Sequence, residues 1–230
     1  MHLHIPDGVL TPWVWAPALL ASLLLLVVSA RTRGAGSRQH VAYQGALGAL
    51  TLAAMAIELP LGPLEYHLTL VGPIGVLLGP AAAFEVLFAV NAILAMLGHG
   101  GFTVVGLNAL VLGAGALLAR PAYVALARRL SPGTSLALAT AIAQAASGAL
   151  WLAVIGVALR GTASAGQPAA PARLGIIAGL AFPMWLVGIA VESVVAVGIG
   201  RFLARVRPDL LPGLPRPATA APGPGTVEAA

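Results

Sequence analysis

Residues 1–30, MHLHIPDGVLTPWVWAPALLASLLLLVVSA, join a short polar segment directly to a long apolar one. The polar segment, residues 1–8, carries a terminal amine, two imidazoles and one carboxylate. Residues 12–30 are apolar over nearly the ~20 residues that a membrane-spanning helix requires. The arginines follow this run instead of preceding it, so we expect an uncleaved first span and not a signal peptide.

The composition is that of an integral membrane protein. Of the 230 residues, 59% are hydrophobic and only 8% are charged, against about 25% charged in soluble proteins. The net charge of +5 comes from arginines that lie between apolar runs, where such residues orient membrane spans, so we expect no nucleic-acid partner. The absence of cysteine excludes thiolate ligands and disulfides, and any bound metal must therefore accept nitrogen and oxygen donors.

Hydropathy divides the chain into apolar runs, most of them close to the length of a helical span. They cover residues 12–30, 41–59, 68–79, 81–97, 103–119, 134–158 and 174–203. We predict an all-α membrane protein with about seven transmembrane helices in a single membrane domain, residues 1–207. The tail, residues 208–230, is rich in Pro, Ala and Gly and is expected to be disordered.

The arginines also predict the topology, because loops rich in Arg stay in the cytoplasm. Three groups of arginines mark the loops expected in the cytoplasm: Arg31, Arg33 and Arg38; Arg120, Arg128 and Arg129; and Arg201, Arg205 and Arg207. Seven crossings with the N-terminus outside and the C-terminus inside satisfy them. The third run is short and broken by Gly and Pro, so residues 68–97 could form two spans or a re-entrant pair. In both cases residues 1–8, 60–67 and 98–102 share the extracytoplasmic face.

The N-terminal segment predicts a nitrogen-rich metal site on that face. The α-amine of Met1, the amide nitrogen of residue 2 and the imidazole of His2 can close two fused chelate rings around one ion. His4 could add a lone imidazole. A further donor must come from elsewhere, and His67 is the candidate, because an ionisable residue in membrane-adjacent sequence usually lines a polar cavity. Asp7 could be a ligand, but its Pro-Asp-Gly context is first of all a turn signature.

Three stretches, in this order, resemble the CbiM/NikM family of cobalt- and nickel-binding membrane subunits. They are the Met-His start with its I-P-D-G turn, the pair His67-Leu68, and GHGGFTVVGLNAL at residues 98–110. The resemblance covers about residues 1–205. It implies a substrate-capture component of an energy-coupling factor (ECF) ABC importer for Co²⁺ or Ni²⁺ in the bacterial inner membrane.

The implied partners are a small accessory membrane subunit, a transmembrane coupling subunit and two ATPase subunits, with membrane lipid around the chain. The sequence contains no Walker A motif and no recognised hydrolase motif, so we expect a transporter subunit and not an enzyme. The alternative is an intramembrane metal-dependent hydrolase or assembly factor. Such a protein would need an open coordination position and a general base close by.

Two positions depart from the family pattern. Glu65-Tyr66 stands where Ser-Gly is usual, and His99 stands where Asp is usual. The start of the chain is also two residues longer before the turn. If the family pattern is aligned from the chain terminus, His2 is the primary side-chain ligand. If it is aligned from the turn, the ligand is His4. The chelate chemistry favours His2.

Several roles remain alternatives at this stage. Planar nitrogen donors suit Ni²⁺ or Cu²⁺, whereas the family also carries Co²⁺. Glu85 and Glu192 could hydrogen-bond between helices or contact the coupling subunit. Glu58 and Glu65 lie in the same predicted loop as the candidate ligand His. Asn108 is expected to be a hydrogen-bond brace. His40, beside the cytoplasmic arginines, is expected to be an ordinary loop residue.

Overall fold

The computed structural model describes residues 5, 7–8, 10–33, 38–61, 64–160 and 169–213, without the side chains of 33, 38–39 and 58–66. Within this part of the chain, seven α-helices are present: α1 (Pro12–Arg33), α2 (Arg38–Ala56), α3 (Val71–Leu78), α4 (Pro80–Met96), α5 (Val105–Leu126), α6 (Pro132–Arg160) and α7 (Ala170–Val206). A hairpin of β1 (Glu58–Leu61) and β2 (Leu64–His67) precedes α3, and a 3-10 turn η1 (Pro208–Leu210) follows α7. The tail beyond residue 213 lies outside the described residues.

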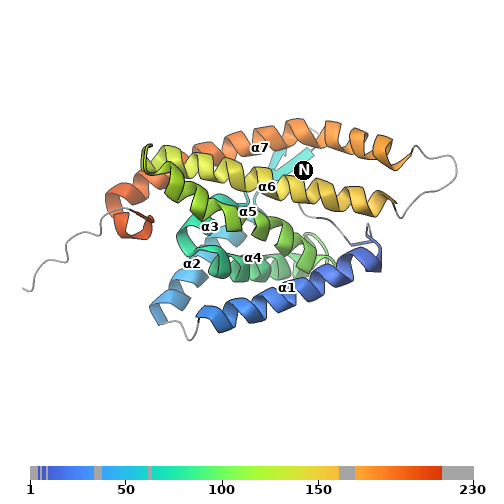
Figure 1. Cartoon of the computed structure of the whole chain (residues 1–230), viewed down its shortest axis with the longest axis horizontal. Coiled ribbons are helices and arrows are strands. Elements are labelled where there is room, and N and C mark those ends of the chain that lie inside the picture. Colours follow the sequence, from blue (N-terminus) through green and yellow to red (C-terminus); the bar gives the residue numbers. More distant parts are fainter. Residues whose placement is uncertain are drawn as a thin grey trace, which may run out of the picture.

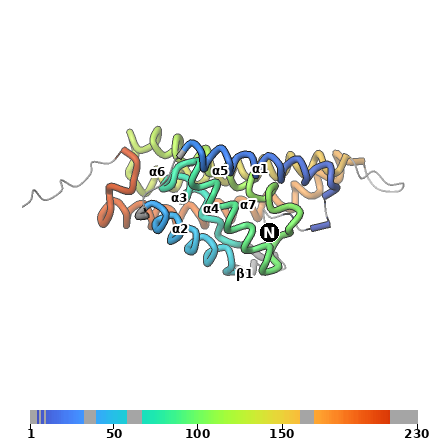
Figure 2. The backbone as a smooth tube through the Cα atoms, turned by 90° about the horizontal axis from the view of Figure 1, so that it is seen from below, coloured from blue at the N-terminus to red at the C-terminus, as the bar shows by residue number. Residues whose placement is uncertain are grey.

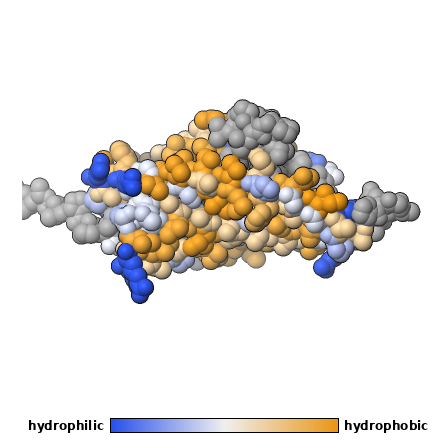
Figure 3. All heavy atoms as spheres, turned by 90° about the horizontal axis from the view of Figure 1, so that it is seen from above, coloured by the Kyte–Doolittle hydropathy of each residue, from blue (hydrophilic) through white to orange (hydrophobic). Residues whose placement is uncertain are grey.

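The prediction of an all-α membrane protein is confirmed. Four helices, α1, α5, α6 and α7, are long and apolar enough to cross a membrane, and α4 is a shorter apolar helix. Their outer surfaces carry large exposed apolar side chains, as lipid-facing helices do. Leu180 and Val194, for example, are 70% and 73% exposed. Figure 3 shows this apolar band between polar residues at the two ends of the molecule.

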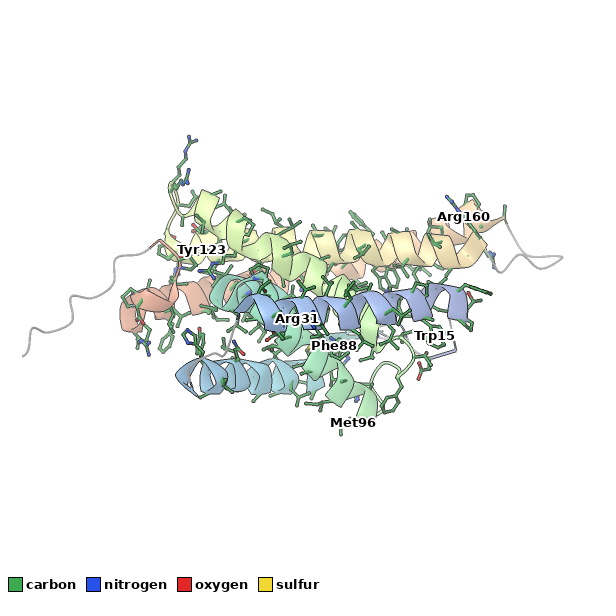
Figure 4. All side chains as sticks on the ribbon, turned by 60° about the horizontal axis from the view of Figure 1, so that its bottom comes forward. Trp15, Arg31, Phe88, Met96, Tyr123 and Arg160 are labelled. Atoms are coloured by element: carbon green, nitrogen blue, oxygen red, sulfur yellow. The ribbon has the colours of Figure 1, made fainter. Side chains whose placement is uncertain are left out.

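The helices form one elongated bundle, in which α1, α5 and α7 run toward one end and α6 runs toward the other (Figures 1 and 2). Three of the helices, α1, α4 and α6, start with proline, whose fixed φ suits the first helical turn. One end, the arginine end, holds the exposed arginines Arg31, Arg120, Arg128, Arg129, Arg201, Arg205 and Arg207. Residues 5, 7, 8 and 10 and the α4–α5 loop lie toward the opposite end, the histidine end (Figure 1). Tyr123 lies toward the arginine end, and Trp15 and Arg160 lie toward the histidine end (Figure 4).

Small residues let α5 pack closely against its neighbours. A Cβ at Gly113 would meet Phe84 on α4, and one at Gly115 would meet Ser147 on α6. Gly45 on α2 does not pack in this way, because a Cβ there would meet nothing within 4 Å. Close helix approach, which small residues permit in membranes, is therefore used by α5 and not by this part of α2.

The third apolar run does not form a full span. Helix α3 has only eight residues, or about 12 Å of helix, against a hydrocarbon core of about 30 Å. It starts inside the bundle and ends at the arginine end, where Gly79 adopts a φ of +76° and lies against the Arg120 guanidinium. Residues 60–67, predicted as a loop, are largely the β-hairpin. Helix α3 is thus a half-helix that follows the hairpin and leads to α4.

Candidate metal centre

The imidazoles of His67 and His99 meet at the histidine end of the bundle. Their ring centres lie 6.0 Å apart, and their planes are inclined by 78°. His67 ends β2 and is only 7% exposed, whereas His99 is half-buried in the loop between α4 and α5. The Nδ1 atoms of both rings are inaccessible to solvent. Two nitrogen donors that are 32 residues apart in the sequence are therefore neighbours in the fold.

The backbone around His99 directs this residue into the bundle. Gly98 and Gly100 both have left-handed φ angles, +84° and +83°, which glycine adopts without the steric penalty of a side chain. The amide of His99 donates to the carbonyl of Leu94 at 2.9 Å, which caps the last turn of α4. The G-x-G part of the predicted glycine-rich stretch therefore forms a tight turn whose only side chain is an imidazole.

The same loop holds the N-terminal segment through Asp7. Its carboxylate accepts hydrogen bonds from the amide of Phe102 at 2.9 Å, the amide of Thr103 at 3.0 Å and the Thr103 hydroxyl. A Cβ at Gly101 would collide with the Asp7 side chain and backbone, so only glycine leaves room for it. Asp7 is thus an anchor between the N-terminal segment and the loop, and its carboxylate oxygens are engaged by the protein.

These hydrogen bonds also change the acidity of the anchor. The Thr103 hydroxyl, followed by the backbone amides of the same loop, lowers the pKa of the Asp7 carboxyl below its ordinary value, although partial desolvation opposes this shift. Hydrogen bonds to a carboxylate favour its ionised form. The anchor therefore stays charged at neutral pH.

A second anchor fastens the segment inside the bundle. The amide of Ile5 donates to Oδ1 of Asn108 at 2.9 Å, and Nδ2 of Asn108 donates back to the Ile5 carbonyl at 3.2 Å. Both residues are buried, each at 2% exposure. The predicted role of Asn108 as a brace agrees with this geometry, and the partner it braces is the N-terminal segment.

The position of His67 depends on a buried polar cluster in the middle of the bundle. Two residues after it, Thr69 donates from its amide to Oε1 of Glu192 on α7 at 2.7 Å, and its hydroxyl contacts the same oxygen at 2.9 Å. Nε2 of Gln144 on α6 donates to the Thr69 hydroxyl oxygen at 2.7 Å. Charged groups inside a membrane protein are costly unless they are hydrogen-bonded, and here Thr69 links the carboxylate on α7 to Gln144 on α6.

The link between this cluster and α3 is strained. Leu70 has a left-handed φ of 52° although its side chain is buried. Such a conformation costs about 1–3 kcal/mol for a non-glycine residue and persists only where the surroundings impose it. The residues on both sides are held, Thr69 by Glu192 and α3 by the core. The strain therefore lies three residues after His67, between a candidate ligand and the half-helix.

The predicted metal ligands are only partly within the described residues. Met1, His2 and His4 lie outside them, so their convergence on His67 stays a prediction. Within the part of the chain that the structure describes, no group of three or more His, Cys, Asp or Glu side chains could hold a metal ion. The structure nevertheless brings His67 together with a residue that was not predicted as a ligand, His99.

The two membrane carboxylates have different surroundings. Glu192 is 1% exposed and hydrogen-bonds between elements, which is one of the two predicted roles. Glu85 instead lines a groove of about 470 Å³ between α2 and α4. Sequence reasoning missed Thr69 and Gln144 as supports of the site; their polarity within apolar runs was the available signal. His40 lies in the first turn of α2 and not in a loop.

The fold and this site define a polytopic α-helical membrane protein whose N-terminal segment is fastened beside a pair of imidazoles, one buried and one half-buried. Residues 4–210 match the CbiM family, described as cobalt uptake substrate-specific transmembrane region. The chain belongs to this family, as its three motifs predicted. It is thus a multi-pass membrane protein and a transmembrane component of cobalt or nickel uptake.

Solved structures agree with the fold. A truncated transition metal transporter aligns with a TM-score of 0.76 and 22% identity, over 87% of this chain and 98% of that one. A second structure, of a transition metal transporter, aligns with the same TM-score and 23% identity, over 88% of this chain and 93% of the other. A comparison with curated protein sequences gives no significant match.

Proposed function

We propose that the chain is the substrate-capture component of an ECF-type importer and binds Co²⁺ or Ni²⁺ through its N-terminal segment together with His67. Met1, His2 and His67 are the ligands, and His4 is the alternative side-chain ligand. The transported ion is the substrate, and energy comes from partner subunits: a small accessory membrane subunit, a coupling subunit and two ATPases. The membrane part, residues 1–207, acts as one domain in the inner membrane.

The observation that carries this proposal is the double fastening of the N-terminal segment. Asn108 holds Ile5 and the Thr103 region holds Asp7, and both belong to the stretch that also carries His99 beside His67. Residues 1–4 lie directly before the first anchor, and four extended residues reach at most about 14 Å. A segment tied at this distance has a high effective concentration near the buried imidazole, which favours chelation.

Metal titration of the purified protein tests the ligand set. With Ni²⁺ as the probe, His2→Ala and His67→Ala are expected to abolish high-affinity binding, because each removes a nitrogen donor. His40→Ala, at the arginine end, is the matched control and should bind as the wild type does. If both ligand variants kept wild-type affinity, the proposed site would be wrong. A selective loss in His4→Ala instead of His2→Ala would move the primary side-chain ligand to His4.

The α-amine needs a test of its own, because the chelate requires a chain that begins at Met1 with a free amine. Residues fused before Met1 should destroy metal binding and uptake, whereas the same residues fused after Ala230 should not. Full binding by the N-terminally extended protein would show that the side chains alone are sufficient.

The orientation can be tested because the chain has no cysteine of its own. Single substitutions Arg31→Cys and Arg160→Cys place one thiol at each end of the bundle. The histidine end is proposed to face outward, so a membrane-impermeant thiol reagent should label Arg160→Cys in intact cells and Arg31→Cys only after lysis. The reverse labelling would refute the orientation.

The ECF partnership makes a separate prediction about uptake. The chain alone should bind the ion but accumulate none against a gradient. Accumulation should require the coupling subunit and the ATPase subunits together, and an ATPase that cannot hydrolyse ATP should abolish it. Gradient-driven accumulation by the chain alone would remove this part of the proposal.

A further inference from the structure

We propose that His99 is a direct ligand of the captured ion, so that the metal centre contains the imidazoles of both His67 and His99. This inference rests on the proposed function, because it assigns one more ligand to the same site. Its starting point is the pairing of the two rings, which holds without any contribution from residues 1–4.

The spacing of the rings fits a shared ion. Metal–nitrogen bonds to imidazole are about 2.0–2.1 Å long, so the centres of two rings bound to one ion lie about 5–6.5 Å apart, depending on the angle at the metal. The observed separation of 6.0 Å falls within this interval. The inclination of 78° lets the rings approach one ion without stacking on each other.

Both imidazoles are held by the fold before any ion arrives. His67 is positioned by the Thr69–Glu192 hydrogen bonds that follow it. His99 is positioned by the left-handed glycines on either side and by the bond from its amide to Leu94. A ligand pair on rigid supports loses little conformational entropy on binding, which strengthens a metal site.

The surroundings suit nitrogen coordination. His67 is 7% exposed, and Nδ1 of each ring is inaccessible to solvent. The nearest carboxylate of the N-terminal segment, Asp7, is occupied by the amides of Phe102 and Thr103. The imidazoles, in contrast, are nitrogen donors of the kind that bind Ni²⁺ and Co²⁺ well.

The additional imidazole changes the coordination number. The amine, amide and imidazole of the N-terminal segment with His67 would form a planar set of four nitrogens. His99 would add a fifth nitrogen to this set. Planar four-nitrogen Ni²⁺ is diamagnetic, whereas a fifth ligand makes the ion paramagnetic, because the preferred geometry of the metal follows its ligands. The magnetic state thus reports the role of His99 separately from affinity.

The experiment compares wild type, His99→Ala, His99→Asn and the control His40→Ala, each purified as the full chain and loaded with Ni²⁺ alone. X-ray absorption should count one imidazole fewer in both His99 variants, and their Ni²⁺ should become diamagnetic. Affinity should fall about tenfold or more, equivalent to about 1.4 kcal/mol. His40→Ala should match the wild type. Thermal melting without metal identifies any misfolded variant, and Asn preserves the polar character of the position.

The two proposals fail in different ways. If wild-type protein bound Ni²⁺ through His67 while the His99 variants retained its imidazole count and magnetism, this inference would be overturned and the proposed function would stand. If wild-type protein bound no Ni²⁺ or Co²⁺, the proposed function would fall, and the ligand assignment of His99 with it.

Discussion

Glu192 on α7 and Thr69, which lies between β2 and α3, are 123 residues apart in the sequence and 2.7 Å apart from carboxylate oxygen to backbone nitrogen. The bond crosses the middle of the bundle and fixes the segment that carries His67. The start of α3 offers no side chain of its own to fix this segment, because its N-cap residue is a left-handed leucine that makes no side-chain hydrogen bond. The half-helix is thus held at its N-terminal end by a negative charge, which the helix dipole also favours.

Glu192→Ala should destabilise the protein and weaken metal binding together. The substitution leaves the Thr69 amide and hydroxyl buried without their acceptor, which costs about 1–3 kcal/mol. Thermal unfolding in detergent, with and without Ni²⁺, measures both effects. Glu192→Gln is the matched control, since its amide oxygen can still accept from Thr69, and it should lie closer to wild type. An alanine variant with an unchanged midpoint would show that the cluster does not position His67.

Asn108→Ala should release the N-terminal segment while leaving α5 intact. Two buried hydrogen bonds to Ile5 are lost, and each unsatisfied buried group costs about 1–3 kcal/mol. Amide exchange at Ile5 should become faster, and metal affinity should fall. Asn108→Asp retains the acceptor but loses the donor to the Ile5 carbonyl, so it should also weaken the anchor. Unchanged exchange at Ile5 in both variants would contradict this role.

The Asp7 anchor should respond to pH in one direction. Its folded pKa is lowered by the Thr103 hydroxyl first, whereas an unfolded Asp titrates near 3.9. A lowered folded pKa adds stability that is present above the unfolded pKa and is lost as pH falls through the folded pKa. The anchor should therefore remain intact at pH 5 and weaken only in strong acid. Titration of the Asp7 carboxyl by NMR should show that Thr103→Ala raises its pKa; an unchanged pKa would refute this cause.

Gly101→Ala should displace the N-terminal segment. A methyl group at this position would overlap the Asp7 carboxylate, and either the loop or the segment must move. We expect weaker metal binding with little change in the core. Gly45→Ala on α2 is a suitable control, because a methyl group there meets nothing within 4 Å and alanine favours a helix. Equal metal affinities in both variants would show that the close approach of Gly101 and Asp7 does not contribute to metal binding.

The N-terminal end of the site was partly predictable because its signals are local. The Pro-Asp-Gly turn and the glycine-rich stretch mark departures from helix, and Asn108 is a polar residue within an apolar run. A turn residue and a brace could therefore be assigned before any contact was known. Their partners could not, since a hydrogen bond between Ile5 and Asn108 joins residues 103 positions apart and no local pattern encodes that distance.

The sequence alone determined the class of protein, the approximate limits of the long helices and the family motifs, because apolar length and composition act through lipid solvation along each segment. The tertiary structure decided the half-helix α3, the hairpin before it and the two close pairs, Thr69 with Glu192 and His67 with His99. These depend on which helix faces meet. When a helix is apolar on all sides, its sequence does not indicate which face packs against a neighbour. The packing of small residues and a few buried hydrogen bonds decide which faces meet.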